Sequence, residues 1–209
     1  MRMFFVSVML VTLAGAANAQ IFTPQYDGPD KGYLVISIGG ARSAREMTFA
    51  PIVLFYRKLD GSRHGSVRYA RLDWMNPMTQ RPDYQDSDEA GVVVVRSLEP
   101  GSYEFHSFLG HRPGQNYDAH FSIPFTVRAG QITYAGDYCF VEEHGSGALE
   151  ITRVKESFFV VRDRSRRDLP LARLKEEHPV GPVNIEIPDL TMARSALFRP
   201  DQQAALAPR

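Results

Sequence analysis

The feature that most constrains the fold is a series of short apolar and β-branched runs that recur at spacings of roughly 8 to 15 residues. The clearest run covers residues 120–127, where Phe121, Ile123, Phe125 and Val127 alternate with Ser, Pro and Thr. Because a strand repeats every two residues, successive side chains point to opposite faces, so this run predicts a strand that buries one face. The other runs predict strands near residues 32–38, 51–57, 66–72, 91–98, 102–109, 131–141, 148–154 and 157–161.

Turn signals separate these runs. Pro124 places the 120–127 strand at a sheet edge, because proline has no N–H to donate to a second neighbour. Residues 75–90 are rich in acids and prolines and predict a long polar loop. The dipeptide Pro100-Gly101 suits a type II turn, while Asp60-Gly61 and Ala129-Gly130 suit hairpin loops. Short, regularly spaced strands with such turns predict a mainly β fold, an antiparallel β-sandwich.

One short C-terminal α-helix is predicted where the strand pattern stops. Asp168 suits the N-cap, and Pro170 then falls in the first turn, where its missing N–H is tolerated. Pro179 ends the helix, because the residue before a proline disfavours helical backbone. Leu171 and Leu174 share a face, and we expect that face to dock on the sandwich.

The N-terminus has the pattern of a secretory signal peptide. Arg2 gives a positive start, residues 4–14 are apolar, and the small residues Ala17 and Ala19 suit a signal peptidase. The apolar run is shorter than the roughly 20 residues that a membrane-spanning helix needs. We expect cleavage after Ala19 and a periplasmic or extracellular mature protein that begins at Gln20.

These patterns predict five parts, namely a signal peptide (1–19), a linker (20–30), a β-sandwich domain (31–162), a helix and extended segment packed on the sandwich (163–198) and a disordered tail (199–209). The mature chain contains no second apolar run of membrane length, so no transmembrane segment is predicted there. The sequence does not determine an oligomeric state.

Charge and cysteine content narrow the partners and the means of stabilisation. The chain has 24 basic and 24 acidic residues, so it lacks the positive field that attracts nucleic acid, and no nucleic-acid partner is predicted. Cys139 is the single cysteine, which excludes an internal disulfide, and the 13 Phe and 9 Tyr residues are the expected core. We expect Cys139 to be a buried apolar side chain, with an intermolecular disulfide or a reactive thiol as the alternatives.

Two histidines are candidates for a surface site. If the 102–109 and 120–127 strands pair as a hairpin, His106 and His120 lie as diagonal neighbours on its outer face, and His111 in the connection is within reach. Three imidazoles suit zinc or copper, but a slip of one residue in register separates them. Solvated surface histidines are therefore the favoured interpretation, and no metal or cofactor is predicted.

Arginines are densest just before the predicted helix, and they are Arg162, Arg164, Arg166 and Arg167. Cations at a helix N-terminus oppose the helix dipole. Salt bridges to nearby acids are one interpretation, and contact with anionic lipid or an acidic partner is the other. Arg164, Arg166 and Arg167 join His106 and His120 as candidate surface-binding residues.

Two stretches, 98–105 and 125–138, carry a pattern found in exported bacterial proteins. The first contains the turn Pro100-Gly101 followed by Tyr103, and the second ends in Tyr-Ala-Gly-Asp and a further Tyr. Together they resemble prealbumin-like β-sandwich modules, which include carboxypeptidase-regulatory-like domains. The resemblance implies a non-catalytic module, because those families share no active site that maps onto this chain.

Catalytic motifs of common secreted hydrolases are missing from the sequence, including Gly-x-Ser-x-Gly, His-Glu-x-x-His and Ser-x-x-Lys. We therefore expect a non-catalytic binding or assembly module of the bacterial cell envelope, not an enzyme, with an envelope protein or a glycan as partner. Catalytic groups can also come together from distant positions, so a secreted hydrolase or a metal-binding protein with a spatially assembled site is the alternative.

Overall fold

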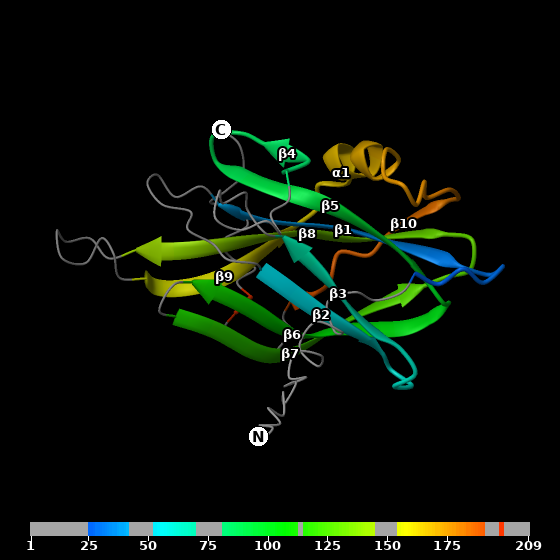
Figure 1. Ribbon diagram of the computed structural model, residues 1–209, viewed down its shortest axis with the longest axis horizontal. Coiled ribbons are helices and arrows are strands. Elements are labelled where there is room, and N and C mark those ends of the chain that lie inside the picture. The colour runs from blue at the N-terminus through cyan, green and yellow to red at the C-terminus, as the bar shows by residue number, and fades with distance from the viewer. Residues whose placement is uncertain are drawn as a thin grey trace, which may run out of the picture.

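Two β-sheets pack face to face, and one short helix covers the outer face of the larger sheet (Figure 1). The computed structural model describes residues 25–41, 52–69, 81–112, 115–144, 154–190 and 197–198. The predicted signal peptide, most of the predicted 148–154 strand and the predicted tail lie outside these ranges. Within them, the mainly β sandwich with one short helix near the C-terminus is confirmed.

The larger sheet has six strands, in the order β10-β8-β1-β5-β4 with β9 also paired to β8. They are β1 (Gly32–Ala41), β4 (Tyr84–Gln85), β5 (Glu89–Leu98), β8 (Ile132–His144), β9 (Val154–Arg162) and β10 (Val183–Ile185). The sheet is not wholly antiparallel, because β8 runs parallel to both β1 and β10. Parallel neighbours need a long crossover, and the chain between β1 and β8 provides one by passing through the other sheet.

The smaller sheet is antiparallel throughout, in the order β3-β2-β6-β7. Its strands are β2 (Ile52–Lys58), β3 (His64–Tyr69), β6 (Gly101–Arg112) and β7 (Gln115–Val127). Pro124 lies on β7 at the sheet edge, as predicted. The N–H of Thr126, two residues on, donates to the Glu186 carboxylate at 2.9 Å, so a side chain partly replaces the missing strand neighbour.

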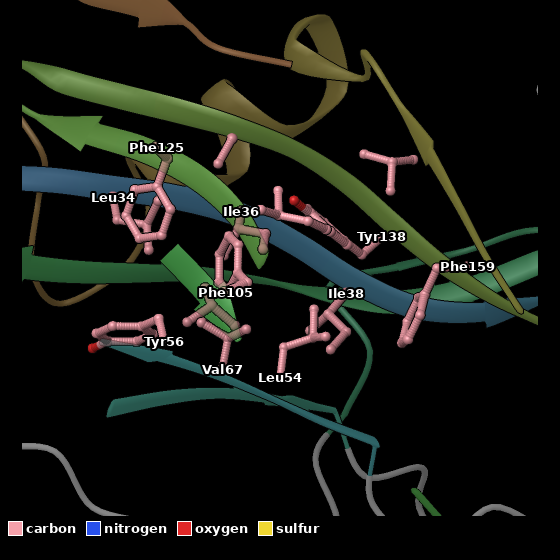
Figure 2. Close-up of a cluster of buried hydrophobic side chains, with 14 of the residues drawn as sticks. Leu34, Ile36, Ile38, Leu54, Tyr56, Val67, Phe105, Phe125, Tyr138 and Phe159 are labelled. Carbon is pink, nitrogen blue, oxygen red and sulfur yellow. The ribbon is translucent and has the colours of Figure 1, made fainter. Parts of the chain in front are cut away.

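Aromatic side chains from both sheets fill the space between them (Figure 2). The ring of Phe105 lies 4.8 Å from that of Phe125 within the smaller sheet and 5.5 Å from that of Tyr138 in the larger one. Full burial of such a side chain contributes roughly 1.5–3 kcal/mol. Cys139 is buried and forms no disulfide, so burial holds this fold together, as its composition predicts.

The helix differs from its prediction. Helix α1 spans Ser165–Ala172, so Asp168 lies inside its first turn and is not the N-cap, and the helix ends well before Pro179. Leu174 does not dock on the sandwich, because it follows the helix and is 78% exposed. The Asp168 carboxyl does not cap the helix and instead accepts hydrogen bonds from Tyr134 and Arg167 in a buried network described below.

Two connections also differ from prediction. The segment predicted as a polar loop, 75–90, contains β4 and the beginning of β5. Asp60-Gly61 does form a hairpin turn between β2 and β3, with Gly61 at φ 76°, but Ala129-Gly130 joins β7 to β8 in the opposite sheet. No helix in the part of the chain that the structure describes is long and apolar enough to cross a membrane.

Candidate functional site

A bulge in β8 brings two polar side chains to the same face of the larger sheet. Tyr134 and Asp137 are three residues apart, a spacing that regular alternation turns to opposite faces. The pairing with β1 shifts register between Val35 and Ser37, and Gly136 adopts φ 104° at this point. An extra residue in one strand restores the phase, so both side chains lie on the outer face beneath α1.

The helix closes over this face and completes a group of charged and hydroxyl side chains, which we call the ionic cluster. Its members are Ser37 of β1, Tyr84 of β4, Glu89 of β5, Tyr134 and Asp137 of β8, Arg162 of β9, and Arg167 and Asp168 of α1. Ser37, Asp137 and Asp168 are completely buried. Six elements therefore meet in one desolvated polar network.

Two arginines link the three carboxylates of the cluster. Arg162 donates to Asp137 at 2.5 Å and also to Glu89. Arg167 donates to Glu89 and Asp168, both at 2.7 Å, and to Asp137 at 3.1 Å. Burial is the largest single effect and lowers the pKa of each guanidinium. The charge of Asp137, together with the other acidic and hydrogen-bonding neighbours, outweighs burial, so the net pKa is raised and both arginines stay charged.

The ring of Tyr84 stacks over the guanidinium of Arg167. The guanidinium carbon lies 3.5 Å from the ring centroid, and the Tyr84 hydroxyl donates to Asp137 at 3.1 Å. Glycines make room for this ring, because a Cβ built on Gly39 or Gly91 would lie 2.7 or 2.3 Å from the hydroxyl oxygen. Burial raises the pKa of Tyr84 well above its ordinary value, so its proton remains available for the hydrogen bond.

The hydrogen bonds of the cluster require one additional proton. The Ser37 Oγ lies 2.7 Å from Asp137 Oδ1 and 2.6 Å from Asp168 Oδ2, yet a hydroxyl has a single hydrogen to donate. The Tyr134 hydroxyl already donates to the same Asp168 oxygen at 2.6 Å. Burial raises the pKa of Asp168 despite the opposing effect of Arg167. A proton on Asp168 satisfies both short contacts and makes three carboxyls and two guanidiniums neutral overall.

This arrangement suits a role in fixing α1 to the sheet better than a role as a reaction centre. Each charged group of the cluster is paired with another member, and the network is closed above by the helix and Tyr84. The nearest thiol is that of Cys139, and burial raises its pKa, so it stays a protonated apolar group. Among the described residues, no group of three His, Cys, Asp or Glu is placed to hold a metal ion.

The predicted histidine pair lies on the outer side of the smaller sheet. The hairpin of β6 and β7 forms, and His120 lies opposite Ser107, next to His106. Burial lowers the pKa of His106, and the charges of Arg57 and His120 act in the same direction. His111, the third expected member, has a side chain outside the described set.

The predicted arginine cluster is divided between the interior and the surface. Arg167 and Arg162 belong to the ionic cluster, in agreement with the salt-bridge interpretation. Arg166 is exposed on α1 and Arg164 is half-buried at its start. The partners of Arg167 were not found from sequence, since Ser37, Glu89 and Asp137 lie far from it along the chain and no spacing pattern connects them.

A groove opens where the larger sheet ends beside the smaller one, with a volume of about 430 Å³. The segment Val92–Arg96 of β5 lines it, together with Ser66 and Arg68 of β3 and with Asp83 and Lys175, which form an ion pair at 2.6 Å. We call this the edge groove. Sequence reasoning missed it, because its walls come from four separate regions of the chain.

The edge groove follows a strand that lacks a full neighbour. Strand β4 pairs with β5 only at Ala90 and Gly91, so from Val92 onward one side of β5 faces no other strand of the described chain. In Figure 1, β4 covers just one end of the long β5. Unpaired strand edges are the usual place where a protein adds a strand from a partner.

Comparisons with protein-family models, with curated proteins and with solved structures each find no match. The geometry of the ionic cluster and of the edge groove is therefore the basis for a proposal about function.

Proposed function

We propose that this chain is an exported, non-catalytic β-sandwich module of the bacterial cell envelope, and that it binds a partner through the edge groove. The observation that carries the proposal is the open edge of β5, which lines a groove of about 430 Å³ bordered by several charged side chains. The two completely buried carboxyl groups of the described residues, those of Asp137 and Asp168, are paired with arginines beneath α1.

Two features of the sequence support the cellular setting. The pattern of residues 1–19 favours export, and the resemblance of 98–105 and 125–138 to prealbumin-like modules favours a binding role over catalysis. A groove along a strand edge suits an extended chain, so an envelope protein fits it better than a branched glycan does.

Site-specific photocrosslinking tests the proposal with a closely matched control. Glu177 lines the edge groove, whereas its neighbour Glu176 is exposed and does not. A photoreactive amino acid is placed at either position in the full-length protein, which is expressed in its native bacterium and irradiated. We expect a discrete adduct from position 177 and none from position 176. Equal adducts at both positions, or none at 177, would contradict binding in the groove.

A further inference from the structure

We infer that the edge groove selects an extended acidic segment, which adds to β5 as a short strand and places its carboxylates on Arg81 and Arg96. This inference rests on the proposed function and specifies the ligand of the same site. Three observations lead to it, namely the free backbone groups of β5, the caps at either end and the balance of charge.

The backbone of β5 offers both a donor and an acceptor to the groove. The N–H of Val93 points away from β1, past the free edge of the sheet, and donates to Asp83 at 2.7 Å. The N–H of Ser97 points the same way and donates to Gln25 at 2.7 Å. The backbone groups of successive residues in an antiparallel strand point alternately toward and away from the neighbouring strand, and the β1–β5 register is unbroken. The N–H of Val95 and the C=O of Val93 therefore also point toward the free edge. Neither of these two groups has a hydrogen-bond partner among the described residues.

Side chains at both ends limit the length of the added strand. Asp83 occupies the edge at Val93, while Gln25 and the N–H of Tyr26 occupy it at Ser97. The free stretch between these caps offers one donor and one acceptor. A segment of about three residues spans it at the usual rise of roughly 3.3 Å per residue in a strand.

Charge in the groove favours an anionic segment. The acids there are already engaged, since Asp83 pairs with Lys175 at 2.6 Å and Glu177 accepts from Gln25 at 2.9 Å. Within the described part of the chain, Arg96 donates only to backbone carbonyls, that of Val95 at 3.0 Å and that of Ser66 at the limit of 3.5 Å.

Arg81 is the second cation available to a ligand. It is exposed, lines the groove and has no ion-pair partner within the described residues. Two guanidiniums that have no carboxylate partner among the described residues therefore line the same groove as the Val95 donor. Guanidinium groups bind carboxylates through paired hydrogen bonds, which gives direction as well as attraction.

The test uses a blocked pentapeptide of alternating glutamate and valine, titrated into the folded protein and followed by NMR. We expect saturable shifts of the Val95 amide and slower hydrogen exchange at that amide. Arg81→Gln and Arg96→Gln should together weaken binding about tenfold, as expected for the loss of two partly exposed charge pairs. Arg166→Gln removes the same charge from an exposed site outside the groove and should leave binding unchanged.

Control peptides separate charge from backbone pairing. Replacement of glutamate by glutamine should weaken binding as the arginine variants do, and methylation of the peptide amides should weaken it by removing the donor to Val93. Arg81→Gln alone is the safer variant for folding, because Arg81 is exposed.

Several results would overturn the inference. They are the absence of saturable binding at millimolar peptide, equal binding to the glutamine peptide, and equal loss in Arg166→Gln. If the position-177 adduct forms while the acidic peptide fails, the ligand class is wrong and the binding function stands. If both experiments fail, the inference and the proposed function are both wrong.

Discussion

Asp168 is the residue whose protonation sets the charge of the ionic cluster. It accepts from Tyr134 and Arg167 and shares a short contact with the Ser37 hydroxyl. The same contact requires a hydrogen that an ionised pair of carboxylates cannot provide. Burial raises the pKa of Asp168, so the native state holds this proton more tightly than the unfolded chain does.

This proton predicts a specific pH dependence of stability. A raised native pKa stabilises the fold fully below the unfolded pKa of about 3.9 and loses that contribution as pH rises through the native pKa. The Asp168→Asn variant does not titrate there. We therefore expect the free energy of unfolding of the wild type to fall relative to that of the variant as the pH rises above about 4. Urea denaturation at each pH measures this difference, and a constant difference would show that Asp168 titrates as an ordinary carboxyl.

Helix α1 is the element that the ionic cluster fixes in place. It is short, has no side-chain N-cap and contains Pro170, so its intrinsic stability is low. Its apolar contact comes from Ala172 and from the partly buried Leu169 and Leu171, which pack on the outer face of the sheet. The ion pairs of Arg167 anchor the other end of the helix.

Adjacent arginines on α1 allow a matched test of this anchoring. Arg167→Met leaves Glu89, Asp137 and Asp168 buried with one cation fewer, and removing one partner of a buried pair costs about 3–5 kcal/mol. Arg166→Met removes an exposed charge and should change stability by less than about 0.5 kcal/mol. Chemical denaturation of both variants gives the comparison. Similar losses of unfolding free energy in the two variants would contradict anchoring of α1 by Arg167.

Strands in which apolar and polar residues alternate strongly were predictable from the sequence. Elements whose formation or bounds depend on tertiary contacts were not. Strand β7 and its edge position follow from Phe121 to Val127 and from Pro124, because burial of one face leaves a period of two. Strand β4 has just two residues, too few to show a period. The start of α1 was misplaced because Asp168 has the chemistry of a cap, and only the fold shows that it is buried.

The candidate site was harder to predict than the fold. Arg167 was identified as a candidate, but its carboxylate partners come from β5, β8 and its own helix. The Tyr-Ala-Gly-Asp sequence carried a usable signal, since Gly136 between two polar residues marks a bulge that turns both to one face. The edge groove has no such signal, because an unpaired strand edge is a property of sheet order.

The whole molecule is held by its apolar core without a covalent link. Cys139 is buried and free, and aromatic rings join the two sheets. We therefore expect the same thermal midpoint with and without reductant, measured by circular dichroism, and labelling of the thiol only after unfolding. A lower midpoint in reductant, or a dimer on a non-reducing gel, would indicate an intermolecular disulfide.

At the scale of the whole molecule, we propose that the protein binds a partner along the open edge of β5. Photocrosslinking from positions 177 and 176 tests it most directly, because these neighbours differ in whether they line the groove. We expect a discrete adduct from position 177 in the native cells and none from position 176. Adducts of equal yield from the two positions, or no adduct from 177, would contradict it.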